Sequence, residues 1–265
     1  MGTESFGHIA CAKRVWTVAA IHGDADKLVR LHDALDERFQ LGDRIVYLGN
    51  FLGRGAQVVQ TIDELVSFRR HLLAKPGMEP GDIVYLRGAQ EEMWRKLLEI
   101  QFARDPREVF AWMLNEGVGA TLAAYGGDVD RAPATFREGT LATGRWTATL
   151  RAAVRGRPGH DEVRGSLRRA AMTTGGELLF VSAGVDPTRP IDEQGDTFWW
   201  GSGYMATMSE PYAGFRLVVR GYDRGRQKAQ VGHVTALIDG GCGFGGTLNA
   251  ACFTLDGHPA DWIEI

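Results

Sequence analysis

Three short apolar runs in the first third of the chain have strand character, and two amphipathic segments separate them. The runs cover residues 14–21, 44–48 and 82–86. Between them, apolar residues recur every three or four positions, which predicts one helix after the candidate cap Asp24 and a second that stops near Pro76. This alternation of strands and helices predicts an α/β fold with mostly parallel pairing and right-handed crossovers.

The hydrophobic pattern changes between about residues 92 and 172, where the apolar spacing fits several helices. We therefore expect a helical insertion, or cap, within a single domain that spans residues 1–265. The last third of the chain returns to strand patterns. Four strands are predicted there, over residues 177–182, 215–220, 230–238 and 247–255.

Composition places the chain among ordinary soluble globular proteins, with 44% hydrophobic and 24% charged residues. No apolar run approaches the roughly 18 residues of a membrane span, so none is expected. Residues 1–12 lack the long apolar core of a secretory signal. The three cysteines, Cys11, Cys242 and Cys252, are scattered and odd in number, which is typical of reduced thiols. We therefore expect a cytoplasmic protein.

Positive charge is concentrated in the expected cap, although the formal net charge of the chain is −3. Residues 131–169 contain nine arginines and three acidic residues, so this window carries +6 and the remainder carries −9. Such a window can attract nucleic acid or an acidic protein, or it can be a solvated helical surface. A nucleic-acid-associated module is therefore one alternative, although the acidic chain lacks a recognised binding motif for nucleic acid.

Five segments place a glycine-marked loop directly after a predicted strand. They are residues 15–23, 45–55, 83–91, 178–184 and 217–223. In open α/β sheets, ligands bind beyond the carboxyl ends of the strands. The functional site is therefore expected at the edge where these five loops lie.

The five loops carry recognisable motifs in a fixed order. They read A-A-I-H-G from Ala19, G-N-F-L-G-R-G from Gly49, R-G-A-Q-E from Arg87, F-V-S-A-G from Phe180 and V-V-R-G-Y from Val218. This order resembles G-D-x-H-G, G-D-x-x-D-R-G, R-G-N-H-E, F-V-H-A-G and V-V-x-G-H of the calcineurin-like metallophosphoesterases. The bacterial serine/threonine protein phosphatases and the symmetrical diadenosine tetraphosphatases are the branch that it resembles most. The resemblance spans nearly the whole chain and implies a four-layer αββα sandwich of two mixed β-sheets with a helical cap.

The same resemblance implies a site with two divalent metals, such as Mn, and shows where this chain departs from it. The motif-equivalent positions are Ala20, His22, Asn50, Gly53, Ala89, Gln90, Ser182 and Tyr222. Of these, only His22 keeps the residue of the family motif. His233 is an alternative to Tyr222 as the fifth-motif position, but its short spacing to Ile238 favours Tyr222.

These substitutions remove the donors that a metal pair requires. Divalent cations need anionic or strongly donating ligands, whereas alanine offers none and Asn50 offers one neutral carbonyl oxygen. Without metal activation, water keeps its bulk pKa of about 15.7, and Gln90 cannot exchange a proton near neutral pH. We therefore expect no catalytic residue and no metal cofactor. His22, Asn50 and His233 are the residual candidates for one weakly held metal.

Three arginines remain at the strand ends, namely Arg54, Arg87 and Arg220. Guanidinium groups suit bidentate binding of phosphate or carboxylate, which predicts an anion-binding cleft. The expected function is that of a pseudophosphatase, a catalytically inactive protein that binds a protein partner or an anionic small ligand. The principal alternative is an active or weakly active phosphoesterase, acting on phosphoproteins or dinucleoside polyphosphates, with an atypical metal site.

Overall fold

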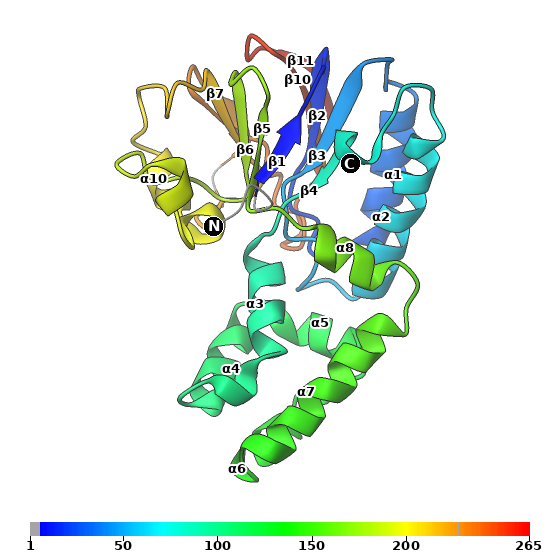
Figure 1. Ribbon diagram of the computed structural model, residues 1–265, viewed down its shortest axis with the longest axis vertical. Coiled ribbons are helices and arrows are strands. Elements are labelled where there is room, and N and C mark those ends of the chain that lie inside the picture. The colour runs from blue at the N-terminus through cyan, green and yellow to red at the C-terminus, as the bar shows by residue number, and fades with distance from the viewer. Residues whose placement is uncertain (1–5, 227) are drawn as a thin grey trace.

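The computed structural model describes residues 6–226 and 228–265, so residues 1–5 and 227 lie outside it. Two β-sheets pack face to face, and helices cover both outer faces (Figure 1). Residues 1–5 belong to the stretch 1–12, where no secretory signal is expected, so that expectation lies partly outside the described residues. The predicted four-layer α/β architecture is confirmed.

One sheet contains the strands that the first third of the sequence predicts. Its order is β11 (Pro259–Glu264), β10 (Asn249–Thr254), β2 (Arg14–Val18), β3 (Asp43–Tyr47) and β4 (Ile83–Tyr85). β2 pairs parallel to β3 and β3 pairs parallel to β4, as the strand–helix alternation predicts, whereas β10 runs antiparallel to β2. The sheet is therefore mixed.

The other sheet is also mixed and has six strands. Its order is β1 (Phe6–Ile9), β5 (Ala170–Thr173), β6 (Leu178–Val181), β7 (Leu217–Arg220), β9 (Thr235–Leu237) and β8 (Gln230–Val231). The prediction of one strand over residues 230–238 is wrong. A turn closed by the Gly232 N–H and the Thr235 carbonyl (2.8 Å) folds this segment into the antiparallel pair β8 and β9.

Helices α1 (Ala25–Asp36) and α2 (Val58–Leu73) cover the five-stranded sheet, and the short helices α9 (Thr197–Trp200) and α10 (Ser202–Met205) lie beside the six-stranded sheet (Figure 1). The predicted cap of α1 is confirmed, because the Asp24 side chain accepts a hydrogen bond from the Lys27 N–H (3.1 Å). Between the sheets, buried apolar side chains from both inner faces form the central core. They include Val15, Val46, Phe180, Val219 and Phe253.

A run of helices separates β4 from β5 and forms the part of the molecule below the sandwich in Figure 1. It consists of α3 (Ala89–Leu97), η3 (Ile100–Phe102), α4 (Pro106–Asn115), α5 (Val118–Ala124), α6 (Ala132–Arg137), α7 (Thr140–Arg155) and α8 (His160–Ser166). We call this run the cap. Its last predicted residues are not helical, because residues 170–172 pair with β1 as part of β5.

The cap is fixed to the sandwich through a buried histidine. The ring of His160, at the start of α8, pairs with the Tyr125 hydroxyl (2.7 Å) and with the Asp63 carboxylate of α2 (2.9 Å). Because both ring nitrogens have partners, this buried contact is polar without leaving an unpaired group.

Within the described residues, no helix is long and apolar enough to cross a bilayer.

Candidate functional site

The loops after β2, β3, β6 and β7 are joined by backbone hydrogen bonds at one edge of the sandwich. The His22 N–H donates to the Asn50 carbonyl (2.8 Å), and the Tyr222 N–H donates to the Ser182 carbonyl (3.0 Å). The Asn50 amide reaches the Ser182 hydroxyl at 3.5 Å and so connects the two pairs. The loop after β4 joins them, because the Gln90 N–H donates to the Asn50 side-chain oxygen (3.0 Å). The structure therefore brings all five predicted motif loops together, as the strand-end argument predicts.

An apolar cluster occupies the centre of this edge. Ala20, Ala183 and Tyr222 are buried together, with Phe244 packed against them. The His22 ring is 1% exposed and meets Tyr222 and Phe244 edge to face, with ring centroids 5.5 and 5.6 Å apart. The positions where the family motifs place metal ligands are thus surrounded by carbon atoms. We call these five residues the His22 cluster.

Burial makes His22 a neutral residue. It lowers the pKa of His22 to about 3, and the nearby Arg54 charge adds to the effect, while the Leu52 carbonyl opposes it in part. Neither ring nitrogen has a hydrogen-bond partner of good geometry among the described residues. His22 is therefore a packed side chain with two buried ring nitrogens that have no such partner, which is energetically costly.

Asn50 and Tyr222 do not replace the missing metal ligands. The Asn50 side-chain oxygen already accepts a hydrogen bond from the Gln90 N–H (3.0 Å). Burial raises the pKa of Tyr222, so its phenol stays protonated and is a poor ligand. Within residues 6–226 and 228–265, no group of three or more His, Cys, Asp or Glu side chains is placed to hold a metal. The donor set therefore does not fit a pair of divalent cations.

Gly53 and Gln90, two further motif-equivalent positions, are packed directly against each other. Gly53 has φ +84°, and a Cβ atom there would lie 2.2 Å from the Gln90 side-chain oxygen. The Gln90 amide donates to the Glu116 carbonyl of the cap (2.7 Å), which fixes its direction. The room that an aspartate at position 53 needs is therefore taken by Gln90. Ala89, the neighbouring motif position, is buried and offers no donor.

Arg54 lies at the His22 cluster and has no carboxylate partner among the described residues. Its guanidinium stacks over the Phe244 ring at 4.1 Å, and its buried Nε has no hydrogen-bond partner. The Arg54 N–H donates to the Gly117 carbonyl (3.1 Å). A Cβ at Gly117 would lie 2.8 Å from the Arg54 side chain, so glycine permits this close approach of the cap. The Arg54 guanidinium is thus fixed in position and still has N–H donors without an acceptor in the described part of the chain.

The structure does not bring the other predicted site residues to this cluster as expected. Arg220 is buried and paired with Asp223 (2.7 Å), so it is not available to an external anion, and that prediction is wrong. Arg87 pairs with Glu92 (3.2 Å) and lines a different pocket. His233 is exposed in the turn between β8 and β9, at the amino end of β9, so it is not a residual metal ligand.

Glu91 is a central residue whose role the sequence reasoning missed. Its buried carboxylate accepts four backbone hydrogen bonds, from Asn50 (2.7 Å), Phe51 (2.8 Å), Leu52 (3.1 Å) and Gly88 (2.8 Å). The position of Glu91 at the start of a helix is explained equally well by the helix dipole, so the sequence alone did not reveal this contact.

Phe244 is the other residue that sequence reasoning missed. It is the only aromatic side chain in the glycine-rich segment 240–246, which otherwise predicts only a tight turn. That turn is present, because the Phe244 N–H and the Gly246 N–H both donate to the Gly241 carbonyl (3.0 and 3.1 Å). The turn directs the ring onto His22, a contact that no local pattern indicates.

Comparison with known proteins shows the fold and no closer relationship. No protein-family model and no curated protein matches the chain. A solved protein provisionally described as a diadenosine tetraphosphatase has a TM-score of 0.56 at 17% identity, covering 97% of both chains. A cold-active protein tyrosine phosphatase has a TM-score of 0.54 at 12% identity, covering 96% of this chain and 79% of its own. A protein serine/threonine phosphatase from Saccharomyces cerevisiae has a TM-score of 0.50 at 12% identity, covering 98% and 82%. The predicted calcineurin-like fold is confirmed.

Replacing Glu91 with glutamine tests its hold on the loop. The new side-chain amide would face backbone N–H groups with its own NH₂, so some of the four donors would lose their acceptor. Glu91→Gln should lower the free energy of unfolding by roughly 2–4 kcal/mol in urea titrations. Glu99→Gln, at an exposed glutamate just after the same helix, is the matched control and should change it by less than about 0.5 kcal/mol. Equal effects of the two substitutions would contradict this role.

His22 should make the fold sensitive to acid. Its folded pKa lies below its unfolded value of 6.5, so the unfolded chain takes up the proton first and stability falls as the pH drops from 6.5 toward 3. Between about pH 7.5 and pH 5, this loss amounts to roughly 2 kcal/mol. His22→Phe should remove it, whereas His233→Phe should not. Urea unfolding at both pH values measures the difference, and an unchanged pH dependence in His22→Phe would refute the assignment.

Proposed function

We propose that this chain is a pseudophosphatase, a protein with a phosphatase fold that binds an anionic ligand or an acidic partner segment without hydrolysing a phosphate ester. The observation that carries this proposal is the His22 cluster, in which aromatic and methyl groups take the place that metal ligands occupy in the family motifs. An apolar cluster of this kind stabilises the fold, but it cannot polarise a phosphate or activate water.

Arg54 gives the proposed cleft its ligand preference. In the family motif this arginine follows two aspartates, whereas here it follows Asn50 and Gly53, and no carboxylate among the described residues pairs with it. Arg226 also lies over the Phe244 ring, at 4.3 Å, and is exposed. Two guanidinium groups around one aromatic ring favour a phosphate or carboxylate group over a cation.

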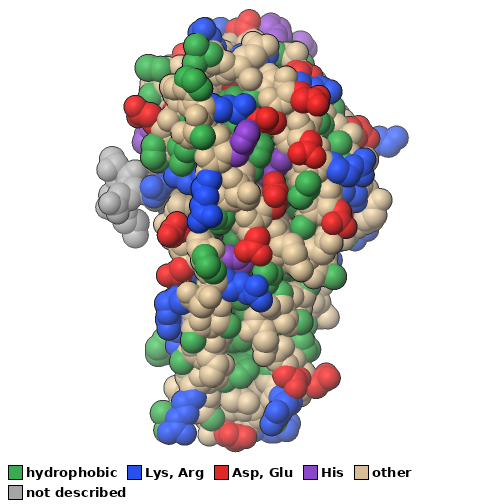
Figure 2. Space-filling view, turned by 90° about the vertical axis from the view of Figure 1, so that its right-hand side faces the viewer, with side chains coloured by type: hydrophobic (Ala, Val, Ile, Leu, Met, Phe, Trp, Pro, Cys, Tyr) green, Lys and Arg blue, Asp and Glu red, His purple; other side chains and the backbone are tan. Residues whose placement is uncertain are grey.

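A protein segment or a small anion fits this surface better than nucleic acid. Figure 2 shows Lys and Arg side chains interspersed with Asp and Glu over one face of the molecule, without one continuous basic patch. Several arginines of the 131–169 window are also engaged within the fold: Arg151 donates to the Leu98 carbonyl, Arg164 pairs with Asp161 and Arg169 donates to the Gly195 carbonyl. These contacts reduce the charge that is available to a phosphate backbone.

The shared fold favours one competing function, hydrolysis at an atypical metal site, because its structural neighbours include phosphatases. We expect the purified protein to show no turnover of p-nitrophenyl phosphate above background, with or without added Mn, and to retain less than one equivalent of metal by elemental analysis. Metal-dependent turnover that is lost in His22→Ala would establish the competing function and refute the proposal.

Anion binding is tested separately by calorimetric titration with inorganic phosphate and with AMP. Arg54→Ala should weaken binding by about tenfold or more, because one charge-assisted contact is lost. Arg216→Ala is the matched control, since Arg216 is exposed and precedes β7 at the opposite end from the cluster. Absence of binding by the intact protein, or equal binding by both variants, would refute anion binding at Arg54.

A further inference from the structure

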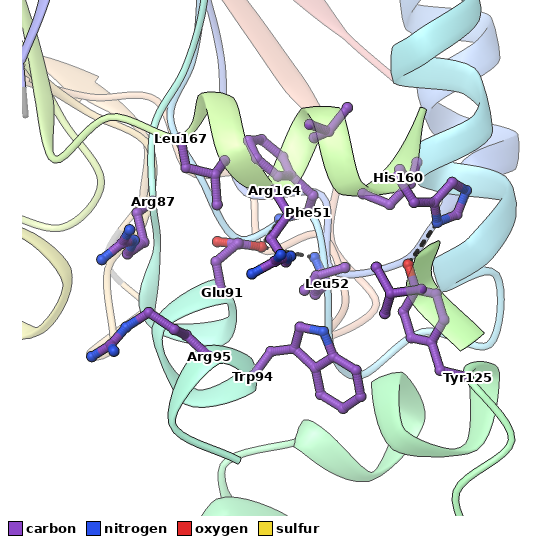
Figure 3. A pocket seen from close by; sticks show the side chains of 13 residues that line it. Phe51, Leu52, Arg87, Glu91, Trp94, Arg95, Tyr125, His160, Arg164 and Leu167 are labelled. Atoms are coloured by element: carbon purple, nitrogen blue, oxygen red, sulfur yellow. Dashed lines mark hydrogen bonds between the residues drawn. The ribbon is translucent and has the colours of Figure 1, made fainter. Parts of the chain in front are cut away.

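A pocket of about 80 Å³ lies where the cap meets the sandwich, separate from the His22 cluster. Figure 3 shows its walls: Phe51 and Leu52 come from the loop after β3, Trp94 from α3, and Leu167 from the segment after α8. Val163 of α8 completes this apolar side. The pocket therefore belongs to the joint between cap and core, and elements of both contribute to it.

The polar groups inside the pocket are already satisfied by the protein. The Glu91 carboxylate, which Figure 3 shows at the centre, accepts its four backbone hydrogen bonds. The His160 ring pairs with Tyr125 and Asp63 through its two nitrogens. Apart from the Glu91 carboxylate and the His160 ring, whose hydrogen bonds are already made, the interior offers carbon surface to a bound molecule.

Cationic side chains lie around the opening. Arg164 extends from α8 toward the pocket, and Arg87 and Arg95 lie on the other side of Glu91 (Figure 3). Arg87, Arg95 and a neighbouring lysine all pair with the one buried carboxylate of Glu92. Arg164 is exposed and pairs with Asp161 through Nε and Nη2. These shared pairings leave guanidinium donors for an additional anion at the rim.

We propose that this pocket binds a short-chain aliphatic carboxylate, with its tail against the apolar walls and its carboxylate at the Arg164 side of the opening. The volume sets the size of the tail. Apolar cavities of about 150 Å³ admit benzene, so a pocket of about 80 Å³ suits a smaller chain of roughly three to five carbons. Guanidinium groups bind carboxylates in a planar, bidentate geometry, which suits a carboxylate head group, and the small planar carboxylate fits this narrow opening better than a tetrahedral phosphate.

This inference does not rest on the proposed function, because it uses neither Arg54 nor the His22 cluster. The two sites share one backbone segment: Phe51 and Leu52 line the pocket, and Arg54 follows two residues later. A short carboxylate here would fill the joint between cap and core. Its binding is therefore measured independently of phosphate and AMP.

Isothermal titration of the full chain with isovalerate tests the proposal. We expect a dissociation constant on the order of 0.1–1 mM. Isovaleramide, which has the same shape without the charge, should bind at least about tenfold more weakly. Decanoate, whose chain exceeds the pocket, should give no comparable heat. Equal binding of the acid and the amide would overturn the carboxylate assignment, and no binding of isovalerate would overturn the site.

Variants locate the binding to this pocket. Val163→Phe and Leu167→Phe place a ring in it and should each weaken isovalerate binding about tenfold or more, while Val29→Phe, on the exposed surface of α1, should not.

Arg164→Ala should weaken binding about tenfold, and Arg155→Ala, an exposed arginine of α7, should change it less than about twofold. Circular dichroism confirms folding, and the half-buried Leu167 provides the test if Val163→Phe does not fold. Wild-type affinity in the folded Leu167→Phe and Arg164→Ala variants would refute the proposal.

Discussion

The carboxylate of Glu91 is the contact on which both candidate sites depend. Its two oxygens bind four backbone N–H groups, and three of these belong to the consecutive residues Asn50, Phe51 and Leu52. The anchored loop holds Asn50 and Arg54 at φ values of +57° and +53°, in a region that side chains rarely adopt. Without this anchor, neither the position of Arg54 nor the apolar walls of the cap pocket would be defined.

Around this anchored loop, the strand-end loops of the calcineurin-like fold surround a largely apolar cluster. The backbone bonds between the strand-end loops are in place, and a single cation, Arg54, remains beside a neutral histidine. Aromatic packing by Tyr222 and Phe244 takes the place of charge. Because burial of carbon stabilises a fold without any bound ion, this edge can be held together by packing alone.

The sequence predicted most of the architecture because local periodicity and loop glycines reflect the backbone directly. β2, β3 and β4 followed from apolar runs, whereas β1, β5 and β11 were missed. β1 and β5 pair with each other although they lie far apart in the sequence, and β11, which pairs with the adjacent β10, is mostly exposed and has no apolar run. Site residues were harder to predict, because their state depends on partners. Asp223 neutralises Arg220, and a hairpin turn carries His233 away from the site. These outcomes depend on side-chain pairing and turn geometry, which the apolar pattern does not report even where the partner is close in sequence, as Asp223 is to Arg220.

The contact between Gly53 and Gln90 has a consequence for anyone who would re-engineer a metal centre into this scaffold. A single aspartate at position 53 would collide with the glutamine, whose direction is set by its bond to the cap at Glu116. An aspartate at position 20 would lie among buried carbon. Installing one ligand at a time is therefore penalised at each step until its neighbours have also changed. A metal centre in this scaffold thus requires several coupled substitutions made together.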